Sequence, residues 1–360
     1  MIDNFENFKL KPNKSIPVDE FVEKALYKPN VGYYTKKIPF GGKGDFITAP
    51  TISNLFSEII TIWVVSTWQK LGEPKNLNFV ELGPGDGSFA KVFINTIKKF
   101  PELDRSINIF LYEKSNFLKN IQKKMIKEKK VKWIKNFNTI KSGPIIFFGN
   151  EFFDAIPIKQ FLFKKKSFFE KHYSFSLPLK NIEEVYQKAK RDDVKIIKGF
   201  KVLRGKKFVE FPKLGFNEMD KITKKIKDLT GGILLIDYGY LNGVNKSTLQ
   251  AVMKNKKIKI DHILKNLGNA DITSLVNFNL LKEYFLKNKM KVKQIVSQKF
   301  FLEKMGIIER AKILEKKMSP KQKIYMTFTL KRLLDSELMG ELFKVIFAYK
   351  SKNSNFLGFR

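Results

Sequence analysis

The sequence contains no cysteine and only two histidines, His172 and His262, in 360 residues. The lack of cysteine excludes disulfides, thiolate metal sites and cysteine nucleophiles. Zinc sites and hydrolytic triads draw mainly on histidine, so two histidines leave almost no room for either class. We therefore expect no metal site.

Long hydrophobic runs are also missing. No segment approaches the ~20 apolar residues that a helix needs to cross a bilayer, and runs such as 59–65 are far shorter. The N-terminal stretch MIDNFENFKLKPNK lacks the apolar region of a signal peptide, and it is neither Arg-rich nor free of acids, as a transit peptide would be. We expect a cytoplasmic protein without membrane insertion.

Arginine is scarce although the chain is strongly basic. The formal net charge is +34, yet only six of the 69 basic residues are Arg. Nucleic-acid interfaces favour Arg for its bidentate fork, and the lysines are scattered from Lys9 to Lys352. Lys, Asn, Ile and Phe abound together, as AT-rich codons would produce. We attribute much of the charge to base composition and do not expect a nucleic-acid partner.

Apolar runs alternate with helix-periodic segments through most of the chain, of which 43% is hydrophobic. Such alternation is typical of parallel strands joined by helices, which build an α/β, doubly wound sheet. Four glycines between residues 32 and 44 predict an irregular loop. We predict strands at 78–82, 107–112, 131–134, 145–148, 232–238, 292–297 and 342–349, and helices at 18–27, 53–71, 116–128, 274–288, 303–316 and 319–323, with a further helix after the glycines at 83–87.

Residues 158–213 break this alternation. Segments 160–169 and 200–211 favour strands, and a stretch of mixed charge separates them. We expect an inserted subdomain here. The predicted organisation is an N-terminal helical and loop segment over the site at 1–75, the first part of the core at 76–157, the inserted subdomain at 158–230 and the rest of the core at 231–360.

The stretch VELGPGDGSF, residues 80–89, is the most specific chemical signal. Glu81, Gly83, Gly85 and Gly87 form an acid-x-Gly-x-Gly-x-Gly pattern between a predicted strand and a helix. Glycines there let the backbone approach a ligand and present amides at a helix N-terminus. The dinucleotide pattern G-x-G-x-x-G would need glycine at position 88, which is Ser88.

A second acid, Glu113, ends the next predicted strand. A carboxylate at that place can accept hydrogen bonds from both hydroxyls of a ribose. NAD enzymes use the same position, so Glu113 supports a nucleoside ligand without choosing between NAD and S-adenosylmethionine. The glycine spacing favours S-adenosylmethionine, whose cationic end suits the carboxylate of Glu81.

Several stretches together resemble the MidA-like methyltransferases of bacteria and mitochondria. The matching stretches cover nearly the whole chain: ALYKPNVGYYT, GGKGDFITAP, VELGPGDGSF, NEFFDAIPIKQF, LLIDYG, STLQAV, ADIT and MGELFKV. The resemblance implies a Rossmann-like class I methyltransferase that uses S-adenosyl-L-methionine. It also implies a protein substrate, because the mitochondrial members are similar to arginine methyltransferases that act on a complex I core subunit during assembly.

Roles follow from the resemblance residue by residue. Gly83, Gly85 and Gly87 would hold the cofactor, with Glu81 at its methionine end and Glu113 at its ribose. Asp45 and Thr48 of GDFITAP would belong to an N-terminal segment that lies over the site.

The acids of GNEFFDAIPI, residues 149–158, follow the fourth predicted strand of the core, where doubly wound sheets bind ligands. Carboxylates can grip a guanidinium fork and aim one nitrogen at the methyl group. We hypothesise that Glu151, and more weakly Asp154, contact the acceptor while Asn150 orients it. Two plainer roles stay open, since Asp154 could cap a turn and Glu151 could pair with a lysine. Asp237 could line the site or cap the loop that follows its strand.

Two departures from the family pattern leave other functions open. Asp86 stands where the family commonly has Arg, and Leu275-Val276-Asn277-Phe278 replaces a His-Val-Asp-Phe run. One alternative is an assembly factor that binds S-adenosylmethionine without transferring a methyl group. Another is a methyltransferase with a nucleobase or small-molecule acceptor, although residues 150–153 lack the N-P-P-[FY] motif of amino-group enzymes.

Overall fold

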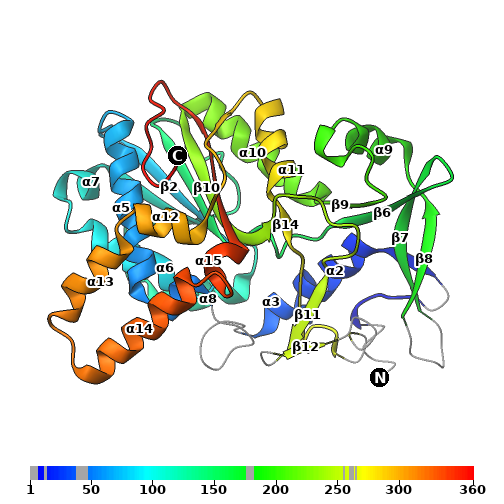
Figure 1. Cartoon of the computed structure of the whole chain (residues 1–360), viewed down its shortest axis with the longest axis horizontal. Helices are drawn as coiled ribbons and strands as arrows, with labels where there is room; N and C mark the ends of the chain where they lie inside the picture. The colour runs from blue at the N-terminus through cyan, green and yellow to red at the C-terminus, as the bar shows by residue number, and fades with distance from the viewer. Residues whose placement is uncertain are drawn as a thin grey trace.

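A large mixed sheet forms the centre of one lobe of the molecule (Figure 1). The computed structural model describes residues 7–11, 14–37, 48–175, 182–253, 256–258, 263 and 266–360. The main path of the sheet has the strand order β15-β17-β10-β5-β2-β3-β4, in which β17 runs antiparallel to both of its neighbours, β15 and β10, and the strands from β10 to β4 are parallel. The short strands β14 and β16 pair with β10 and β17. The strands are β2 (Leu77–Leu82), β3 (Ile107–Tyr112), β4 (Val131–Ile134), β5 (Ile145–Asn150), β10 (Gly231–Tyr240), β14 (Val276–Asn277), β15 (Lys291–Val292), β16 (Val296–Ser297) and β17 (Phe343–Lys350).

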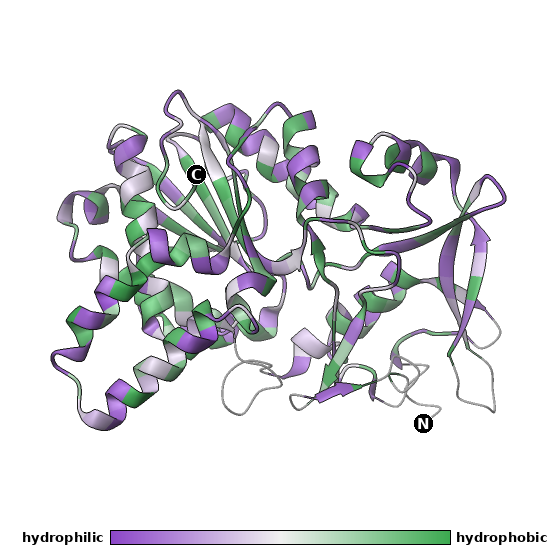
Figure 2. Ribbon diagram, viewed as in Figure 1, coloured by the Kyte–Doolittle hydropathy of each residue, from purple (hydrophilic) through white to green (hydrophobic). Residues whose placement is uncertain are grey.

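Both faces of this sheet are buried. Alternate residues of one strand enter two different hydrophobic clusters, as Phe79 and Val80 of β2 do, because successive side chains of a strand point to opposite faces. The apolar strands stand out in Figure 2 against helices with one polar side. Helices α5, α6 and α12–α14 supply one cluster, and α10 and α11 supply the other. The helices of this lobe are α4 (Ala49–Ile52), α5 (Asn54–Lys70), α6 (Ser88–Ile97), α7 (Pro101–Ser106), α8 (Asn116–Met125), α10 (Lys213–Leu229), α11 (Phe278–Lys287), α12 (Gln298–Lys304), α13 (Ile307–Glu315), α14 (Pro320–Leu334) and α15 (Met339–Leu342).

The second lobe contains two smaller sheets and the N-terminal helices. One antiparallel sheet runs β1-β7-β6-β9 with β8 paired to β7, and the other runs β12-β11-β13. Helix α2 packs between them and contacts β6, β7 and β13. Its elements are β1 (Ser15–Pro17), α2 (Val18–Tyr27), α3 (Tyr33–Lys36), β6 (Lys159–Lys164), β7 (Ser167–Phe175), β8 (Ile182–Lys188), α9 (Arg191–Lys198), the 3-10 helix η1 (Lys201–Leu203), β9 (Phe208–Phe211), β11 (Gln250–Met253), β12 (Lys256–Ile258) and β13 (Asp271–Thr273).

The predicted α/β fold class is confirmed, and the five parallel strands lie where the apolar runs predicted them. Segment 160–169 forms strand structure, as its residues favour, and divides it between two strands. Lys165 and Lys166 adopt positive φ values of 47° and 59° and turn the chain into the hairpin β6–β7. The strand favoured at 200–211 is wrong in its first half, which forms η1 before β9 begins.

Several helices differ from the prediction. The pattern missed α10, a long helix that covers β5 and β17. The predicted helix at 303–316 is broken at Gly306, whose left-handed φ of 83° separates α12 from α13. Helix α14 is much longer than the predicted 319–323, and α3 forms inside the segment expected to be a loop. The part of that loop after Lys37 lies outside the described residues.

Strand β2 lies between β3 and β5, so the crossovers that leave β2 and β5 run in opposite directions along the sheet. Such a reversal of strand order opens a crevice at the carboxyl ends of the strands. The glycine turn follows β2 and GNEFFDAIPI overlaps the end of β5, so the fold brings both signals to this crevice. None of the helices in the described part of the chain is long and apolar enough to span a membrane.

Candidate active site

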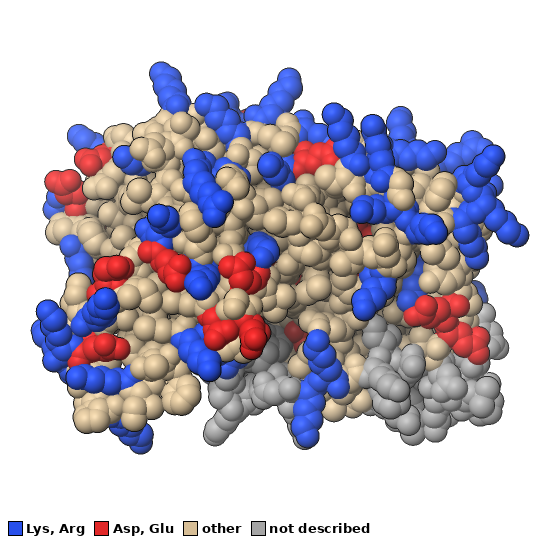
Figure 3. All heavy atoms as spheres, in the orientation of Figure 1, with Lys and Arg blue, Asp and Glu red and all other residues tan. Residues whose placement is uncertain are grey.

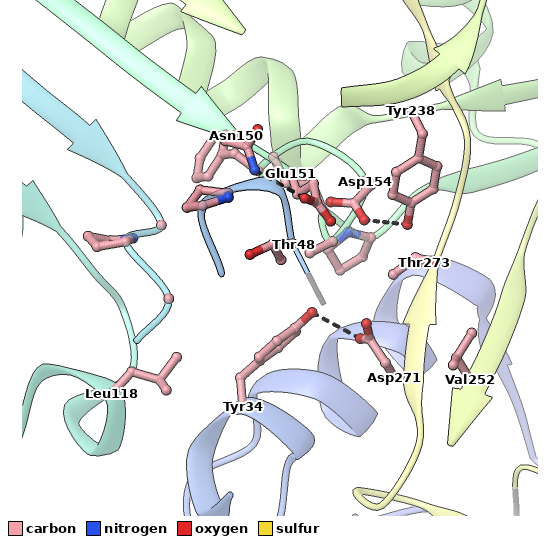
Figure 4. Close-up of a pocket in the computed structure, with 18 of the residues that line it drawn as sticks. Tyr34, Thr48, Leu118, Asn150, Glu151, Asp154, Tyr238, Val252, Asp271 and Thr273 are labelled. Carbon is pink, nitrogen blue, oxygen red and sulfur yellow. Dashed lines mark hydrogen bonds between the residues drawn. The ribbon is translucent and has the colours of Figure 1, made fainter. Parts of the chain in front are cut away.

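A cavity of about 830 Å³ opens at this crevice between the two lobes. Its wall combines the glycine turn, the ends of β3 and β5, helices α2 to α4, residues 248–252, strand β13 and the α14–α15 region. Figure 4 shows Leu118 on one side of the cavity and Val252 with Thr273 on the other. The cavity therefore has a half beside the glycine turn and a half beside the second lobe.

Acids outnumber bases among the charged residues that line this cavity. Among the described residues, eight lining residues are acidic and three are basic, although the whole chain has 69 basic and 35 acidic residues. The acids are Glu23, Glu81, Asp86, Glu113, Glu151, Asp154, Glu218 and Asp271; the bases are Lys114, Lys257 and Arg332. A cavity with more acidic than basic side chains, inside a basic protein, favours cationic ligands.

The glycine turn forms one wall of the cavity, which Gly83 and Gly85 line directly. Both have positive φ values, of 62° and 58°, that side chains disfavour. A Cβ atom on Gly83 would lie 3.2 Å from the ring of Phe152. Gly87 does not line the cavity; it is the left-handed N-cap residue of α6. The turn thus exposes backbone atoms without side chains to the cavity, and helix α6 begins directly after it.

Glu81 is buried at 4% exposure and lines the cavity at the end of β2. Burial raises the pKa of its carboxyl well above the usual range, and repulsion from Asp86 and Glu113 adds to the shift. Among the described residues, none donates a hydrogen bond to its Oε2 atom. A buried acid without a donor is costly unless a ligand partners it, which fits the ammonium end of S-adenosylmethionine.

Glu113 stands at the carboxyl end of β3 and lines the same half. Its Oε1 accepts from the amide of Ser115 at 2.8 Å, and its Oε2 accepts from Nε2 of Gln122 at 3.2 Å. Burial raises the pKa of Glu113 to about 7, although these two bonds oppose the shift. The bonds fix the carboxylate, and its further lone pairs can accept from ribose hydroxyls.

Glu151 lies in the left-handed region, with φ of 49°. A residue with a side chain is strained there by about 1–3 kcal/mol, and such strain clusters at functional sites. The backbone is held by a 2.9 Å bond from its amide to the carbonyl of Ile236, and Oε1 accepts from Nδ2 of Asn150 at 3.1 Å and from the amide of Ala49 at 3.4 Å. These contacts aim the carboxylate into the cavity (Figure 4).

Burial raises the pKa of Glu151 to about 8, and repulsion from Asp154 adds to the shift. The hydrogen bonds from Asn150 and Ala49 and the charge of Arg332 lower it again. No described lysine pairs with Glu151. In the described residues the salt-bridge alternative for Glu151 therefore has no partner.

Asp154 shares the acidic wall with Glu151 and is buried. Its Oδ2 accepts a short hydrogen bond from the hydroxyl of Tyr238. Burial raises its pKa to about 6, against the lowering effect of this bond. Asp154 thus lines the cavity and is oriented by a tyrosine from the end of β10.

Asp237 does not line the cavity. Its Oδ2 accepts from the amides of Phe153 and Asp154 at 2.8 and 3.2 Å. These bonds hold the loop after β5 in place rather than the loop after its own strand β10, so the cap that was left open for Asp237 is not the one that these bonds form. Burial, together with repulsion from Asp154, raises its pKa well above the usual range.

Of the remaining residues that were expected at the site, the structure describes Thr48 but not Asp45. Thr48 lines the cavity and begins α4 through a capping box with Thr51. Asp45 lies outside the described residues, as does His262. The pattern did not single out Tyr34, Tyr238, Thr248, Asp271 or Arg332, all of which line the cavity. Four of them lie within or next to stretches that carry the family resemblance, and that location was the available signal.

Both departures from the family pattern have structural consequences. The Oδ1 atom of Asp86 accepts from the amide of Ser88 at 2.9 Å, so this residue helps to start α6. Asn277 caps α11 through a 3.0 Å bond from the amide of Leu280. Leu275 lines the cavity and makes that part of the wall apolar.

Solved structures share this fold. A COG1565 superfamily member from Burkholderia thailandensis, bound to S-adenosyl-homocysteine, superposes with a TM-score of 0.79 at 21% identity, covering 95% of this chain and 89% of that chain. The fold and the acid-lined crevice define a class I, Rossmann-like methyltransferase. Residues 59–296 match the model of a family of S-adenosyl-L-methionine-dependent methyltransferases. The chain belongs to this family, and the predictions of family, enzyme class and cofactor are confirmed.

Curated relatives are similar over most of the chain. The protein arginine methyltransferase NDUFAF7, mitochondrial, of Xenopus tropicalis is 28% identical over 373 residues, which cover 94% of this chain and 83% of the relative. The homolog of Caenorhabditis elegans is 28% identical over 331 residues, covering 84% and 75%.

Proposed function

We propose that this methyltransferase modifies an arginine side chain of a protein, and that the protein is a complex I core subunit. The observation that carries the arginine assignment is the acidic wall of Glu151 and Asp154. This wall lies next to the half of the cavity beside the glycine turn, which we call the cofactor half. The printed names of the relatives support it. The complex I subunit is supported only by the resemblance to mitochondrial family members.

In the cofactor half, Gly83 and Gly85 would lie against S-adenosylmethionine while Gly87 shapes the turn. Glu81 would pair with its ammonium group and Glu113 with its ribose. Thr48 and Asp45 belong, in this proposal, to the N-terminal segment that covers the site. The cofactor supplies a methyl group on a positively charged sulfur, so acids nearby favour its binding. We place the reaction in the cytoplasm of a bacterial cell.

In the other half, Glu151 would grip the guanidinium of the substrate. A guanidinium is always charged in proteins and has no free lone pair, so it is a poor nucleophile. A carboxylate at two of its N–H groups localises the charge and aims the third nitrogen at the methyl carbon. Asn150 would hold Glu151 in this orientation through its 3.1 Å bond.

Glu151 would also remove the proton. A new N–C bond forms as the C–S bond breaks with its electron pair left on sulfur, and the methylated guanidinium must then lose one proton from that nitrogen to remain a single cation. Glu151 would release one of the two N–H groups that it holds and accept this proton. The raised pKa of Glu151, about 8, makes it a suitable acceptor near neutral pH. Asp154 would remain beside it and stabilise the cation.

The decisive experiment compares wild type with Glu151→Gln. Purified protein receives S-adenosylmethionine with a labelled methyl group and an arginine peptide, and mass spectrometry locates the label. We expect wild type to methylate arginine, and Glu151→Gln to bind the cofactor within about twofold of wild type while transfer falls by about 100-fold or more. Glu102→Gln, at an exposed position of α7, is the matched control.

Each other outcome points to a different function. Cofactor binding with no transfer to any acceptor would support an assembly factor that binds S-adenosylmethionine. Transfer to nucleic acid or a small molecule would replace the arginine assignment. Loss of cofactor binding in Glu151→Gln would contradict the acceptor role of this residue.

A further inference from the structure

Strand β13 forms the wall of the cavity on the side of the second lobe, and the proposed reaction does not yet use it. Its side chains alternate, so Asp271 and Thr273 line the cavity while Ile272 packs into a hydrophobic cluster. Asp271 is 3% exposed. A carboxylate this buried needs hydrogen-bond or cationic partners, and it is one of the eight acids of the lining.

The fold ties this strand to the acceptor wall. The amide of Ser274 donates to the carbonyl of Asp154 at 3.2 Å. Asp271 is three residues before Ser274, and a strand rises about 3.3 Å per residue, so Asp271 stands roughly 10 Å along the chain from that bond. This is the scale of a side chain of the size of arginine.

Two stacked tyrosines link the same walls. Tyr34 donates from its hydroxyl to Oδ1 of Asp271 at 3.0 Å, and Tyr27 donates to the carbonyl of Ala155 at 2.9 Å. Their rings stack with centroids 5.5 Å apart. In Figure 4, Tyr34 and Asp271 lie on one side of the open space, and Glu151, Asp154 and Tyr238 lie on the other. The cavity therefore contains two carboxylate–tyrosine pairs, Asp271–Tyr34 and Asp154–Tyr238, on opposing walls.

We propose that Asp271, positioned by Tyr34, is a second guanidinium-binding carboxylate and selects arginine over lysine; this inference rests on the proposed function. A guanidinium presents five N–H groups in a planar fork and can donate to opposite walls at once. An ammonium is compact and donates from one point, so it cannot serve both walls. A carboxylate accepts several hydrogen bonds, so the bond from Tyr34 and a bond from the substrate are compatible.

The test measures selectivity in Asp271→Asn, which keeps an oxygen for the hydroxyl of Tyr34. We expect the KM for an arginine peptide to rise by about tenfold or more, the loss of a charged hydrogen bond. The kcat should stay within about threefold, and the inhibition constant of the matching lysine peptide should change by less than about twofold. Tyr34→Phe should raise the same KM by a smaller factor, because it removes the positioning bond only.

Controls separate this subsite from a structural role. Asp192→Asn, at an exposed position of α9, should behave as wild type. The dissociation constant of S-adenosylhomocysteine should be unchanged in all variants. The melting temperature and the KM of Asp271→Glu, measured side by side, should show whether a carboxylate at this position restores both the stability and the binding of the arginine peptide. An arginine KM within about twofold of wild type in Asp271→Asn overturns the proposal, as does an equal loss for arginine and lysine peptides.

Failure of the proposed function would look different. If wild type transfers no methyl group to arginine, the proposed function fails whatever the variants do. Binding of the arginine and lysine peptides to the wild-type and Asp271→Asn proteins, measured by calorimetry with S-adenosylhomocysteine present, then decides the selectivity on its own.

Discussion

Four titratable side chains around one cavity show how position changes the behaviour of a residue. Burial raises the pKa of Glu113 to about 7, of Glu151 to about 8 and of Asp154 to about 6, and it raises that of Glu81 as well. The carboxyls of Glu113 and Glu151 are therefore partly protonated near neutral pH until a cation enters. Each cationic ligand should lower these pKa values and release protons on binding.

Activity should follow the titration of Glu151. Only the ionised carboxylate can grip the guanidinium, so log kcat/KM for the arginine peptide should rise with pH and level off above about 8. Below about 6 the slope should steepen as Asp154 also becomes protonated. A pH–rate profile between pH 5.5 and 9.5, on the order of a tenfold rise per pH unit below the upper limit, would show this. A flat profile would contradict the base role.

The raised pKa of Glu151 also makes the stability of the protein depend on pH. The folded pKa of Glu151 lies above the unfolded value, so in the window between them the native state holds more protons than the unfolded chain. The free energy of unfolding of the ligand-free protein should therefore fall as pH rises toward about 8. In Glu151→Gln this contribution should be absent, which urea titrations at several pH values would detect.

At the scale of elements, strand β9 in the second lobe holds a wall of the cavity through one residue. Glu210 accepts from the amide and the hydroxyl of Thr248 at 2.9 and 2.7 Å, and from Nε2 of Gln160 at 2.9 Å. The hydroxyl of Thr248 in turn accepts from the amide of Leu275 at 3.1 Å. Both Thr248 and Leu275 line the cavity.

Glu210→Ala should loosen this wall. It removes the acceptor of one buried donor on Gln160 and two half-buried donors on Thr248, so we expect a loss of roughly 1–3 kcal/mol in the free energy of unfolding. Amide exchange at 248–252 should accelerate more than in β2 or β5, and the KM for the peptide should rise. Glu183→Ala, exposed on β8, is the control. Uniform exchange across the chain would instead indicate a general loss of stability.

The elements differ in how well sequence predicted them. The strands β2, β3, β5 and β10 are buried on both faces and read as short apolar runs between turns, so periodicity and length sufficed. Helix α10 carries many lysines on its exposed side, which dilutes its apolar stripe, and the hairpin β6–β7 turns at two lysines rather than at a glycine. Neither feature has a strong local signal. The division of the chain at 75, 157 and 230 stays a prediction.

The whole molecule combines a basic surface with an acidic cavity. Blue side chains spread over most of the face in Figure 3, including the lobe of β6, β7 and α9. The formal net charge is +34, but acids outnumber bases among the described residues that line the cavity. The surface charges act on a substrate while it approaches, whereas the acids of the cavity act on it once it is bound. Salt screens the long-range effect of the surface charges more than the short-range effect of the cavity acids.

Salt should therefore change the choice among substrates. At low ionic strength a peptide with glutamates around its arginine should have a higher kcat/KM than one with lysines, by about tenfold. At about 0.5 M salt, where the Debye length is only a few ångströms, the two values should approach within about twofold. Measuring both peptides from 0.05 to 0.5 M tests this. A preference for the lysine-flanked peptide at low salt would show that the acids of the cavity dominate the approach.

The sequence by itself determined the class of fold and predicted which residues form the cofactor half of the site. The glycine turn, Glu81 and Glu113 lie within 33 residues, because the first crossover of a doubly wound sheet is local in the chain. Only the tertiary structure showed which side chains meet in the other half of the cavity. Tyr34, Asp154, Tyr238 and Asp271 come from four distant segments and meet because the second lobe folds back over the end of the sheet. The roles of these side chains depend on contacts between opposite walls of the cavity. The spacing of residues along the chain does not show such contacts.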